Sequence, residues 1–350
     1  MGTLFGHGLV LIIRMFIAIA GWIPLRVGVA AMKPVADLVL ILGFKKRVIL
    51  KNLDYIYEDR LTAAEKWAIA KASNRNAFAM IFECLRCANR RATAEGISKV
   101  SWADQELIDS CDVDPRACLF AVAHSGNFDL PAVEWMLTRK RQGGVVMKPL
   151  ENKPLNDLLV EIRTQFKCHV ISSRAPDAVE QINAFLKTGA HLCILPDQNA
   201  KRKGVVVDFL GKPCSTFKGP ARTWLENREH TRLIVAVPVR IEQGIEHTVL
   251  AEEITDFEPS GDTDADVQAL TERITDVMTR LVFKHPESYL WHHRRWWKGP
   301  DGEPVTASIA VHGPKSKAAA EDGAEAATDE AGTEDKTTAK AEEPASAGSA

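Results

Sequence analysis

The sequence predicts an α/β fold with a central mixed sheet flanked by helices. Between residues 117 and 284, short apolar segments alternate with longer segments whose apolar residues recur at helical spacing. The short segments are apolar at successive positions, which is typical of strands that helices cover on both faces. Both ends of the chain depart from this pattern. We therefore divide the sequence into a membrane anchor at 1–44, a globular domain at 45–313 and a tail at 314–350.

The N-terminal part contains no Glu and a single Asp, and it holds two dense apolar runs. The first run, 4–23, has about the twenty residues that a helix needs to cross a bilayer, but Arg14 in its middle costs at least about 2.5 kcal/mol there. The second run, 25–44, is broken by Pro34. The basic residues 45–47 follow it and favour the cytoplasmic, anionic leaflet. We predict one span or an interfacial helical hairpin, with the rest of the chain cytoplasmic; core helices of a soluble domain are the alternative.

The globular domain begins with an amphipathic helix at 62–90, where apolar residues recur at helical spacing. The predicted strands are 117–123, 144–148, 169–172, 191–195, 233–241 and 248–254. The predicted helices between and after them are 130–141, 154–166, 176–187, 218–227 and 264–284. In sheets of this kind, ligands bind beyond the carboxyl ends of the strands. Polar residues directly after a strand are therefore the candidates for a site.

Charge is distributed unevenly along the chain. The whole sequence has a net charge of -2, but residues 314–350 hold nine acidic and four basic residues, so the remainder carries +3. A nearly neutral body without a basic stripe argues against nucleic acid as a partner. The acidic tail contains no Val, Ile, Leu, Phe or Trp, so it has too little apolar surface to fold, and we predict that it is disordered.

The cysteines and histidines give no sign of a metal centre. Seven cysteines occur without the spacing of a disulfide framework, which indicates a reducing compartment. Cys84 and Cys87 form a C-x-x-C on a helical pattern without a second pair, whereas a zinc site needs about four ligands. His292 and His293 are adjacent, so their side chains point apart on a helix or a strand. We expect no metal and no cofactor.

The first polar cluster follows the strand at 117–123. His124 leaves the strand end, Gly126 permits a tight turn, and a helix starts shortly afterwards. This arrangement can bring the carboxylate of Asp129 onto one imidazole nitrogen, which leaves the other nitrogen as a general base. Because no G-x-S-x-G surrounds Ser125, we expect His124 to activate a substrate hydroxyl. Taken alone, the H-x4-D spacing also suits a structural histidine at a turn.

Two further strand ends carry charged or amide side chains. Asp197 and Gln198 follow the strand at 191–195 and are candidates for a substrate-binding or electrostatic element. Arg174 follows the strand at 169–172, and it could pair with Asp197 or bind an anion. A surface cap on the next helix is the alternative for Arg174.

A third cluster, at 289–298, combines four aromatic residues with three cations. This composition suits a membrane interface or the face that binds a phosphorylated headgroup. Stacking on nucleic-acid bases is the alternative. The candidates for contact with a lipid or its headgroup are Arg294, Arg295 and Trp296.

Several sequence motifs together resemble the bacterial lipid A biosynthesis acyltransferase family, the late lauroyl and myristoyl transferases, with which phosphatidylinositol-mannoside acyltransferases are grouped. The likeness spans roughly residues 1–300 and includes the apolar N-terminus. The motifs are H-x4-D at 124–129, K-P-L-E-N-K-P-L-N at 148–156, I-S-S-R at 171–174, L-P-D-Q at 195–198, V-V-V-D-F-L-G-K-P-C-S-T-F-K-G-P-A-R at 205–222 and the closing W-H-H-R-R-W-W. Their order and spacing are more specific than any single motif.

The resemblance implies a glycerolipid-acyltransferase-like fold and transfer of a fatty acyl chain to a hydroxyl of a membrane lipid. It implies acyl-carrier protein as the donor, with acyl-CoA the weaker candidate, at the cytoplasmic face of the bacterial inner membrane. The family's scheme makes His124 the base and Asp129 its orienting carboxylate. It places Arg174 and Asp197 beside the thioester, where they would stabilise the oxyanion or organise the pocket. It requires no covalent intermediate, metal or cofactor.

The sequence also departs from the family pattern. Lipid A enzymes commonly carry Glu at the position of Asp129, and the E-G-T-R motif of glycerolipid acyltransferases does not occur. The acceptor therefore stays open between a lipid A precursor, another glycolipid and an amino-lipid. An inactive lipid-binding protein on the same fold and an esterase that uses Ser125 are the competing functions. An acidic carrier protein would dock on a basic face, either residues 139–141 or residues 201–203.

Overall fold

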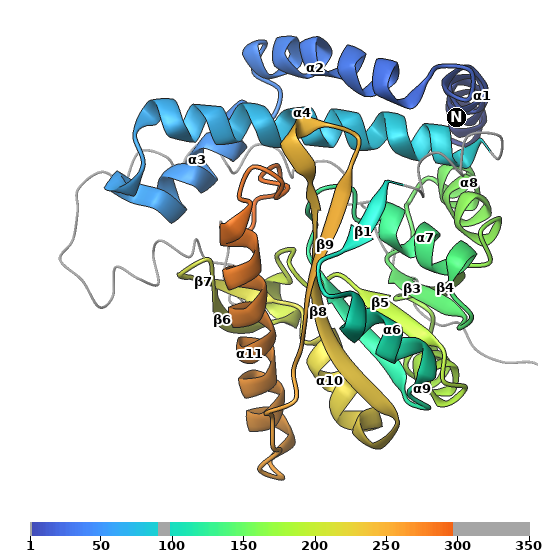
Figure 1. Cartoon of the computed structure of the whole chain (residues 1–350), viewed down its shortest axis with the longest axis vertical. Coiled ribbons are helices and arrows are strands. Elements are labelled where there is room, and N and C mark those ends of the chain that lie inside the picture. The colour runs from blue at the N-terminus through green and yellow to red at the C-terminus, as the bar shows by residue number, and fades with distance from the viewer. Residues whose placement is uncertain (1, 90–98, 297–350) are drawn as a thin grey trace, which may run out of the picture. The chain divides into compact units, whose positions relative to one another are not determined.

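The computed structural model describes residues 2–89 and 99–296, and within them the main sheet has seven strands in the order β1-β9-β8-β2-β5-β3-β4 (Figure 1). The strands are β1 Val100–Trp102, β2 Ala117–Val122, β3 Gly143–Met147, β4 His169–Ser172, β5 His191–Ile194, β8 Thr231–Arg240 and β9 His247–Glu253. Strands β8 and β9 are antiparallel, and all other neighbouring pairs are parallel. The predicted central mixed sheet is therefore confirmed.

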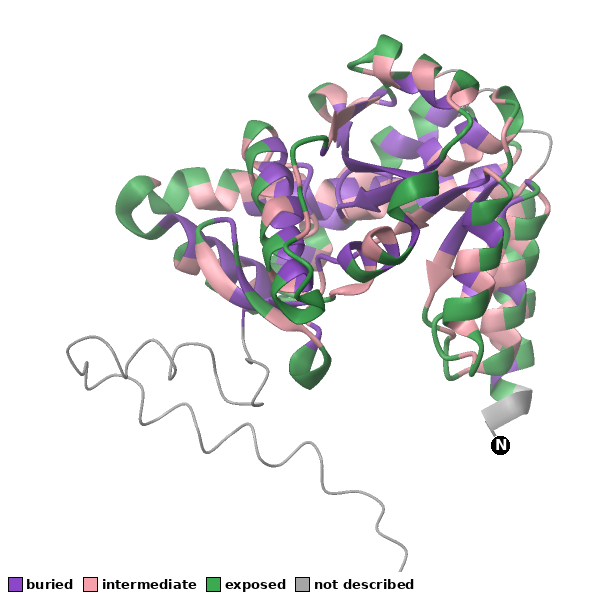
Figure 2. Cartoon of the chain, turned by 90° about the horizontal axis from the view of Figure 1, so that it is seen from below, coloured by how far each residue is buried: buried purple, intermediate pink, exposed green. Residues whose placement is uncertain are grey.

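Helices cover both faces of this sheet, as the apolar strands predict. The helices are α1 Gly2–Ala20, α2 Leu25–Ile41, α3 Lys46–Tyr57, α4 Ala63–Ala88, α6 Gln105–Val113, α7 Leu130–Thr138, α8 Lys153–Thr164, α9 Ala178–Lys187, α10 Gly219–Asn227 and α11 Thr263–Lys284. Along β2, Leu119 and Ala121 join the core under α9, α10 and α11, whereas Cys118 and Phe120 join a second core with residues of α6 and α7. Figure 2 shows the strands largely buried between helices with exposed outer faces.

Helix α4 connects the N-terminal helices to the rest of the fold. It begins with a capping box, in which the Thr62 hydroxyl and the Glu65 carboxylate each bond the other residue's backbone N–H. Helix α2 packs closely on it, because a Cβ at Gly28 would lie 1.9 Å from the Phe82 ring. The single Asp of the N-terminal part, Asp37, forms a bidentate ion pair with Arg75 of α4. Figure 1 shows α4 lying between α2 and the sheet.

Two parts of the fold lie outside the sequence prediction. Strand β1 and helix α6 precede β2. Residues 205–216 form a separate antiparallel hairpin of β6 Val205–Phe209 and β7 Lys212–Thr216. Its two-residue turn places Leu210 at φ +54°. Such turns usually carry Asn-Gly or Asp-Gly, and the Leu-Gly found here is not a recognisable hairpin signal in the sequence.

The N-terminal residues form the two helices α1 and α2. In the described part of the chain, no single helix is long and apolar enough to cross a membrane, although Leu25–Ile41 and Lys46–Arg60, bent by 85°, pass together on length and composition. The membrane anchor at 1–44 therefore stays a prediction. The tail predicted at 314–350 lies outside the described residues.

Candidate active site

The pairing of two neighbouring strands determines the centre of the site. Strand β2 pairs with β5 in parallel, with Leu119 opposite Leu192 and each later pair one residue further along. The same offset of 73 positions separates His124 from Asp197. The two side chains therefore meet just beyond the carboxyl ends of the strands, where ligands of such sheets bind.

His124 and Asp197 are joined by two hydrogen bonds. The imidazole Nδ1 lies 2.6 Å from Asp197 Oδ1, and the backbone N–H of His124 donates to Asp197 Oδ2 at 2.8 Å. Asp197 is 2% exposed, so its charge is held against the imidazole in a dry environment. A carboxylate on Nδ1 fixes the tautomer that leaves the Nε2 lone pair available as a base.

The predicted contact between Asp129 and His124 is wrong. Asp129 is the residue before α7, and its Oδ1 accepts a hydrogen bond of 2.9 Å from Nη2 of Arg163 in the last turn of α8. The turn at 123–129 brings the carboxylate toward α8, while β5 supplies the carboxylate that holds His124. Asp129 still acts on His124 at longer range, because its charge contributes to raising the pKa of the imidazole.

The electrostatics of the pair favour a protonated imidazole more than water does. Burial alone would lower the pKa of His124, but the charge and hydrogen bond of Asp197 outweigh it, so that the pKa lies above its usual value. The pKa of Asp197 is lowered in turn: its burial acts to raise it, and the contact with His124 overcomes this. The site thus contains a base whose conjugate acid is stabilised by a buried anion.

Gln198 lies at the other side of the imidazole. Its side-chain Nε2 is 3.2 Å from His124 Nε2, so the amide faces the nitrogen that would act as the base. The backbone of His124 is held as well, because its carbonyl accepts the N–H of Leu290 at 2.9 Å, and the N–H of Gly126 donates to the Ser288 carbonyl at 2.8 Å. A Cβ at Gly126, which has φ +53°, would lie 2.9 Å from a backbone oxygen of β8, so the turn packs tightly on that strand.

Arg174 lies apart from this centre. It follows β4, the edge strand, which β3 separates from β5, and its side chain is exposed. Of the two roles considered for Arg174, pairing with Asp197 is not formed among the described residues, where Asp197 pairs with His124; binding of an anion stays a prediction.

The described part of the aromatic and basic segment, residues 289–296, packs against the site from inside the protein. Arg295 is 1% exposed and donates to the carbonyl of Gln198 at 2.9 Å, while its guanidinium lies over the Phe209 ring. Trp296 is buried too and stacks on Phe209. The prediction that Arg295 and Trp296 contact lipid is therefore wrong, because both side chains are covered by protein. Arg294 is exposed.

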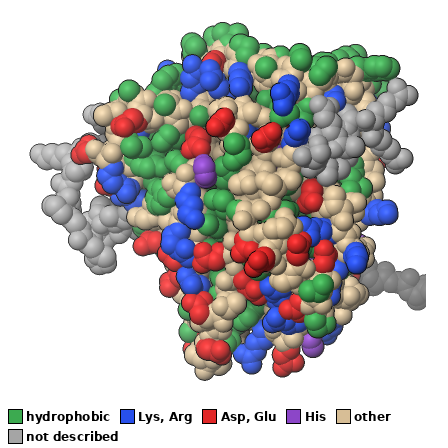
Figure 3. Space-filling view, in the orientation of Figure 1, with side chains coloured by type: hydrophobic (Ala, Val, Ile, Leu, Met, Phe, Trp, Pro, Cys, Tyr) green, Lys and Arg blue, Asp and Glu red, His purple; other side chains and the backbone are tan. Residues whose placement is uncertain are grey.

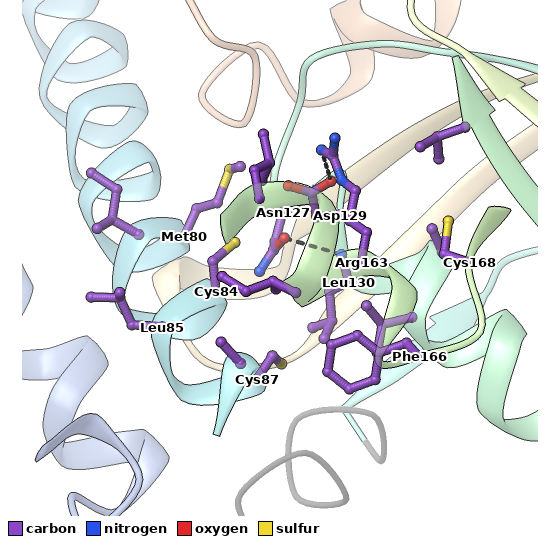
Figure 4. Close-up of a pocket in the computed structure, with 17 residues that line it drawn as sticks. Met80, Cys84, Leu85, Cys87, Asn127, Asp129, Leu130, Arg163, Phe166 and Cys168 are labelled. Atoms are coloured by element: carbon purple, nitrogen blue, oxygen red, sulfur yellow. Dashed lines mark hydrogen bonds and ion pairs between the residues drawn. The ribbon is translucent and has the colours of Figure 1, made fainter. Parts of the chain in front are cut away.

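An apolar cavity of about 310 Å³ adjoins the 123–129 turn (Figure 4). Side chains of α4, α7 and α8 line it, and Asn127, Asp129 and Arg163 are its polar members near the turn. Figure 4 shows Cys87 and Phe166 at the end away from Asp129. Its volume lies at the lower end of the range for small-molecule pockets, and its walls suit a hydrocarbon chain.

Four residues that contribute to this region were missed from sequence: Glu83, Asn127, Arg163 and Arg240. Asn127 lies inside the H-x4-D motif, and Glu83 is an acidic residue at a core position of the helix predicted at 62–90. Both residues could therefore have been recognised from the sequence.

In the described part of the chain, no group of three or more His, Cys, Asp or Glu side chains is arranged to hold a metal ion.

Comparison with known proteins shows the family of this chain. A model of the bacterial lipid A biosynthesis acyltransferase family matches residues 5–298. The chain belongs to this family. It is 25% identical over 209 residues to a protein of Mycobacterium tuberculosis strain H37Rv named phosphatidylinositol mannoside acyltransferase, which covers 58% of this chain and 61% of that protein. A protein of the same name from Mycolicibacterium smegmatis is 27% identical over 133 residues, 35% of this chain and 43% of the relative. The chain thus matches less than two thirds of the length of these members of the acyltransferase family.

Proposed function

We propose that this protein transfers a fatty acyl chain from an acyl thioester to a hydroxyl of a membrane lipid, with His124 as the general base. The observation that carries the proposal is the buried His124–Asp197 pair, and an apolar cavity adjoins the same 123–129 turn through Asn127 and Asp129. Membership of an acyltransferase family supports the same reaction class.

The geometry supports direct transfer. Nε2 of His124 takes the proton of the acceptor hydroxyl as its oxygen attacks the thioester carbonyl, and Asp197 stabilises the imidazolium. The tetrahedral intermediate then collapses: the C–S bond breaks, and the leaving thiolate takes the proton from the imidazolium. Ser125 takes no part in this scheme, since it is 1% exposed and its Oγ has no hydrogen-bond partner among the described residues.

Gln198 is the proposed donor to the developing oxyanion. Its amide is within 3.2 Å of His124 Nε2, so a modest rotation brings an N–H to a carbonyl oxygen held beside the base. Asp197, expected from sequence beside the thioester, is an anion and acts instead on the imidazole. Arg174, exposed at the sheet edge, stays a candidate for contact with the anionic part of a substrate.

The proposed donor is an acyl-carrier protein, with acyl-CoA the weaker candidate. Of the two basic segments considered from sequence, residues 201–203 suit docking better, because their side chains are exposed and follow the Asp197–Gln198 loop directly. In the other segment, Arg139 is bound to Asp109 and Asp112, and Arg141 donates to backbone carbonyls. That segment follows α7 and precedes β3. It therefore lies at the amino ends of the parallel strands, whereas His124 lies at their carboxyl ends.

The proposed location is the cytoplasmic face of the bacterial inner membrane, with α1 and α2 lying on it. Figure 3 shows hydrophobic side chains gathered along the edge of the molecule that α2 forms in Figure 1. The exposed large apolar residues of this region are Phe5, Leu11, Ile12, Met15, Phe16, Ile19, Trp22, Val27, Val35, Leu38, Ile41, Leu42 and Phe44. Contiguous apolar patches of this kind mark membrane or protein interaction sites, and the basic residues 45–47 favour an anionic membrane.

A lipid A precursor is the proposed acceptor, in keeping with the family description, and other glycolipids or an amino-lipid are the alternatives. The test is acyl transfer from acyl-carrier protein to extracted membrane lipids, with wild type and His124→Ala compared. We expect His124→Ala to lose activity by about 10²-fold or more. A variant as active as wild type would overturn the mechanism, labelling of Ser125 by a serine-directed probe would favour an esterase, and lipid binding without turnover would favour an inactive lipid-binding protein.

A further inference from the structure

A buried polar cluster lies between α4, the end of β8 and the 123–129 turn. The two carboxylate oxygens of Glu83, on α4, accept hydrogen bonds from the two terminal nitrogens of Arg240, at 2.6 Å each. The amide of Asn127 donates to Glu83 Oε2 at 2.9 Å, and His247 Nε2 lies 3.2 Å from Oε1. Glu83 and Arg240 are each 2% exposed. This cluster joins α4, the 123–129 turn, the end of β8 and the start of β9 at a single carboxylate.

Glu83 is charged in this environment. Burial alone would raise its pKa, but Arg240 and His247 lower it to about 2. A buried anion without partners is very unfavourable, so the loss of any hydrogen bond to the Glu83 carboxylate carries a large free-energy cost. The direction in which Asn127 points is therefore determined by the carboxylate.

Asn127 transmits this constraint to the turn. While its amide donates to Glu83, its side-chain oxygen accepts the N–H of Leu130, the first residue of α7, at 3.1 Å. The two bonds fix the turn between His124 and the helix that follows. From the other side, the backbone N–H of Arg240 donates to the hydroxyl of Ser288, whose carbonyl receives the N–H of Gly126.

We propose that the buried Glu83–Arg240 ion pair positions the 123–129 turn for catalysis through Asn127. The inference rests on the proposed function in its use of His124 as the base. Glu83, Arg240 and Asn127 are positioning residues, since none of them contacts the imidazole. A displacement of the base by about 1 Å is enough to lower a rate about 10²-fold.

The experiment compares Glu83→Gln, Asn127→Ala and the double variant with wild type. The readouts are kcat and KM for acyl transfer and the pKa of His124 from NMR titration of its ring. Each single variant is expected to lower kcat about 10- to 100-fold with KM within about twofold, and to lower the pKa of His124 because the turn drifts from Asp197. Since both residues act through one contact, the double variant should be no worse than the poorer single variant.

The chain offers a matched control at the opposite end of the same strand. Arg232 of β8 makes a similar bidentate pair with Glu253. Glu253→Gln removes the same chemistry away from the site, and it should leave kcat and the pKa of His124 unchanged. Should Glu83→Gln fail to fold, Glu83→Asp keeps the charge beside Arg240 while drawing it away from Asn127, and the same losses are expected.

Two results would overturn the inference. One is a folded Glu83 variant with the kcat and His124 pKa of wild type; the other is a double variant whose loss in kcat equals the product of the two single losses. Failure of the proposed function is distinguishable, because it would appear as absence of turnover in wild type, whereas the NMR titration of His124 reports positioning with or without turnover.

Discussion

Asp197 is the residue on which the chemistry of His124 depends, and its removal should change the pH profile. We expect Asp197→Asn to lower kcat about 10²-fold or more, because the asparagine cannot stabilise the imidazolium. The pKa of His124 is raised by Asp197, and the base is active above that pKa. Without the carboxylate the pKa falls, so the acid limb of the pH–kcat profile should move to lower pH while the plateau drops.

Asp129→Asn provides the comparison. Its charge also raises the pKa of His124, but it is a weaker influence than Asp197, so the acid limb should move in the same direction by less. An unmoved acid limb in Asp197→Asn, or a larger movement in Asp129→Asn than in Asp197→Asn, would contradict the assignment of roles. The measurement is kcat against pH for the three proteins.

The difference between these two carboxylates shows what sequence could supply at the residue scale. The strand-end rule correctly placed His124 and Asp197 at one edge of the sheet, because both follow apolar strands. The H-x4-D spacing then favoured Asp129 as the partner, since it is near in sequence. Only the register of β2 against β5, a pairing of residues 73 positions apart, decides which carboxylate reaches the imidazole.

At the scale of elements, α4 organises the site through a polar stripe on its buried face. Ser73, Asn76 and Glu83 occur at helical spacing, and all three are buried. The Ser73 hydroxyl donates to the Tyr289 carbonyl at 2.6 Å, and the Asn76 amide donates to the Glu287 carbonyl at 2.8 Å. The stripe thus holds the segment that supports His124. Apolar periodicity predicted this helix well, but it cannot show where a helix carries polar groups inward.

Ser73→Ala should weaken that support. It removes the side-chain donor to the buried Tyr289 carbonyl, which keeps the N–H of Trp291 at 3.1 Å. The free energy of unfolding is therefore expected to fall by about 0.5–1.5 kcal/mol, and kcat is expected to fall with it. Thr275→Val is the control, since among the described residues its buried hydroxyl bonds to carbonyls of its own helix, α11. Equal kcat in wild type and Ser73→Ala, measured with chemical denaturation on the same samples, would contradict a role in the site.

The cavity between α4, α7 and α8 should determine the length of the acyl chain. Cys87 and Phe166 belong to one apolar cluster at the end away from Asp129. Cys87→Phe fills that end, so kcat/KM should fall most for the longest acyl donors and least for the shortest. The measurement is kcat/KM across a series of chain lengths, in which the shortest donor serves as the internal control. A uniform loss at all lengths would show that the chain lies elsewhere.

At the scale of the whole molecule, α1 and α2 carry the prediction of one membrane span or an interfacial hairpin, with core helices of a soluble domain as the alternative, and this prediction needs an experiment. Inward-facing residues such as Leu25, Val29 and Leu40 are buried, while a large apolar set faces outward. Helix α2 is fixed to α4 by the ion pair between Asp37 and Arg75, and we propose that its outward apolar residues face a membrane. A surface with one face packed on protein and the other apolar is typical of helices that lie in a membrane interface.

Leu42 is the position where this interface can be tested most directly. It is 76% exposed at the end of α2, just before the basic residues 45–47. Burial of a leucine in the interface contributes about 1.5–3 kcal/mol, and Leu42→Glu also adds a negative charge that an anionic surface repels by about 1 kcal/mol. Binding to vesicles with anionic lipids should therefore weaken at least about tenfold in flotation assays.

The control is Val113→Glu, which places the same charge at an apolar residue that is 80% exposed but lies on α6. This variant should bind as wild type does. Equal binding of wild type and Leu42→Glu would remove α2 from the interface, and equal loss in both variants would mean that binding follows net charge alone.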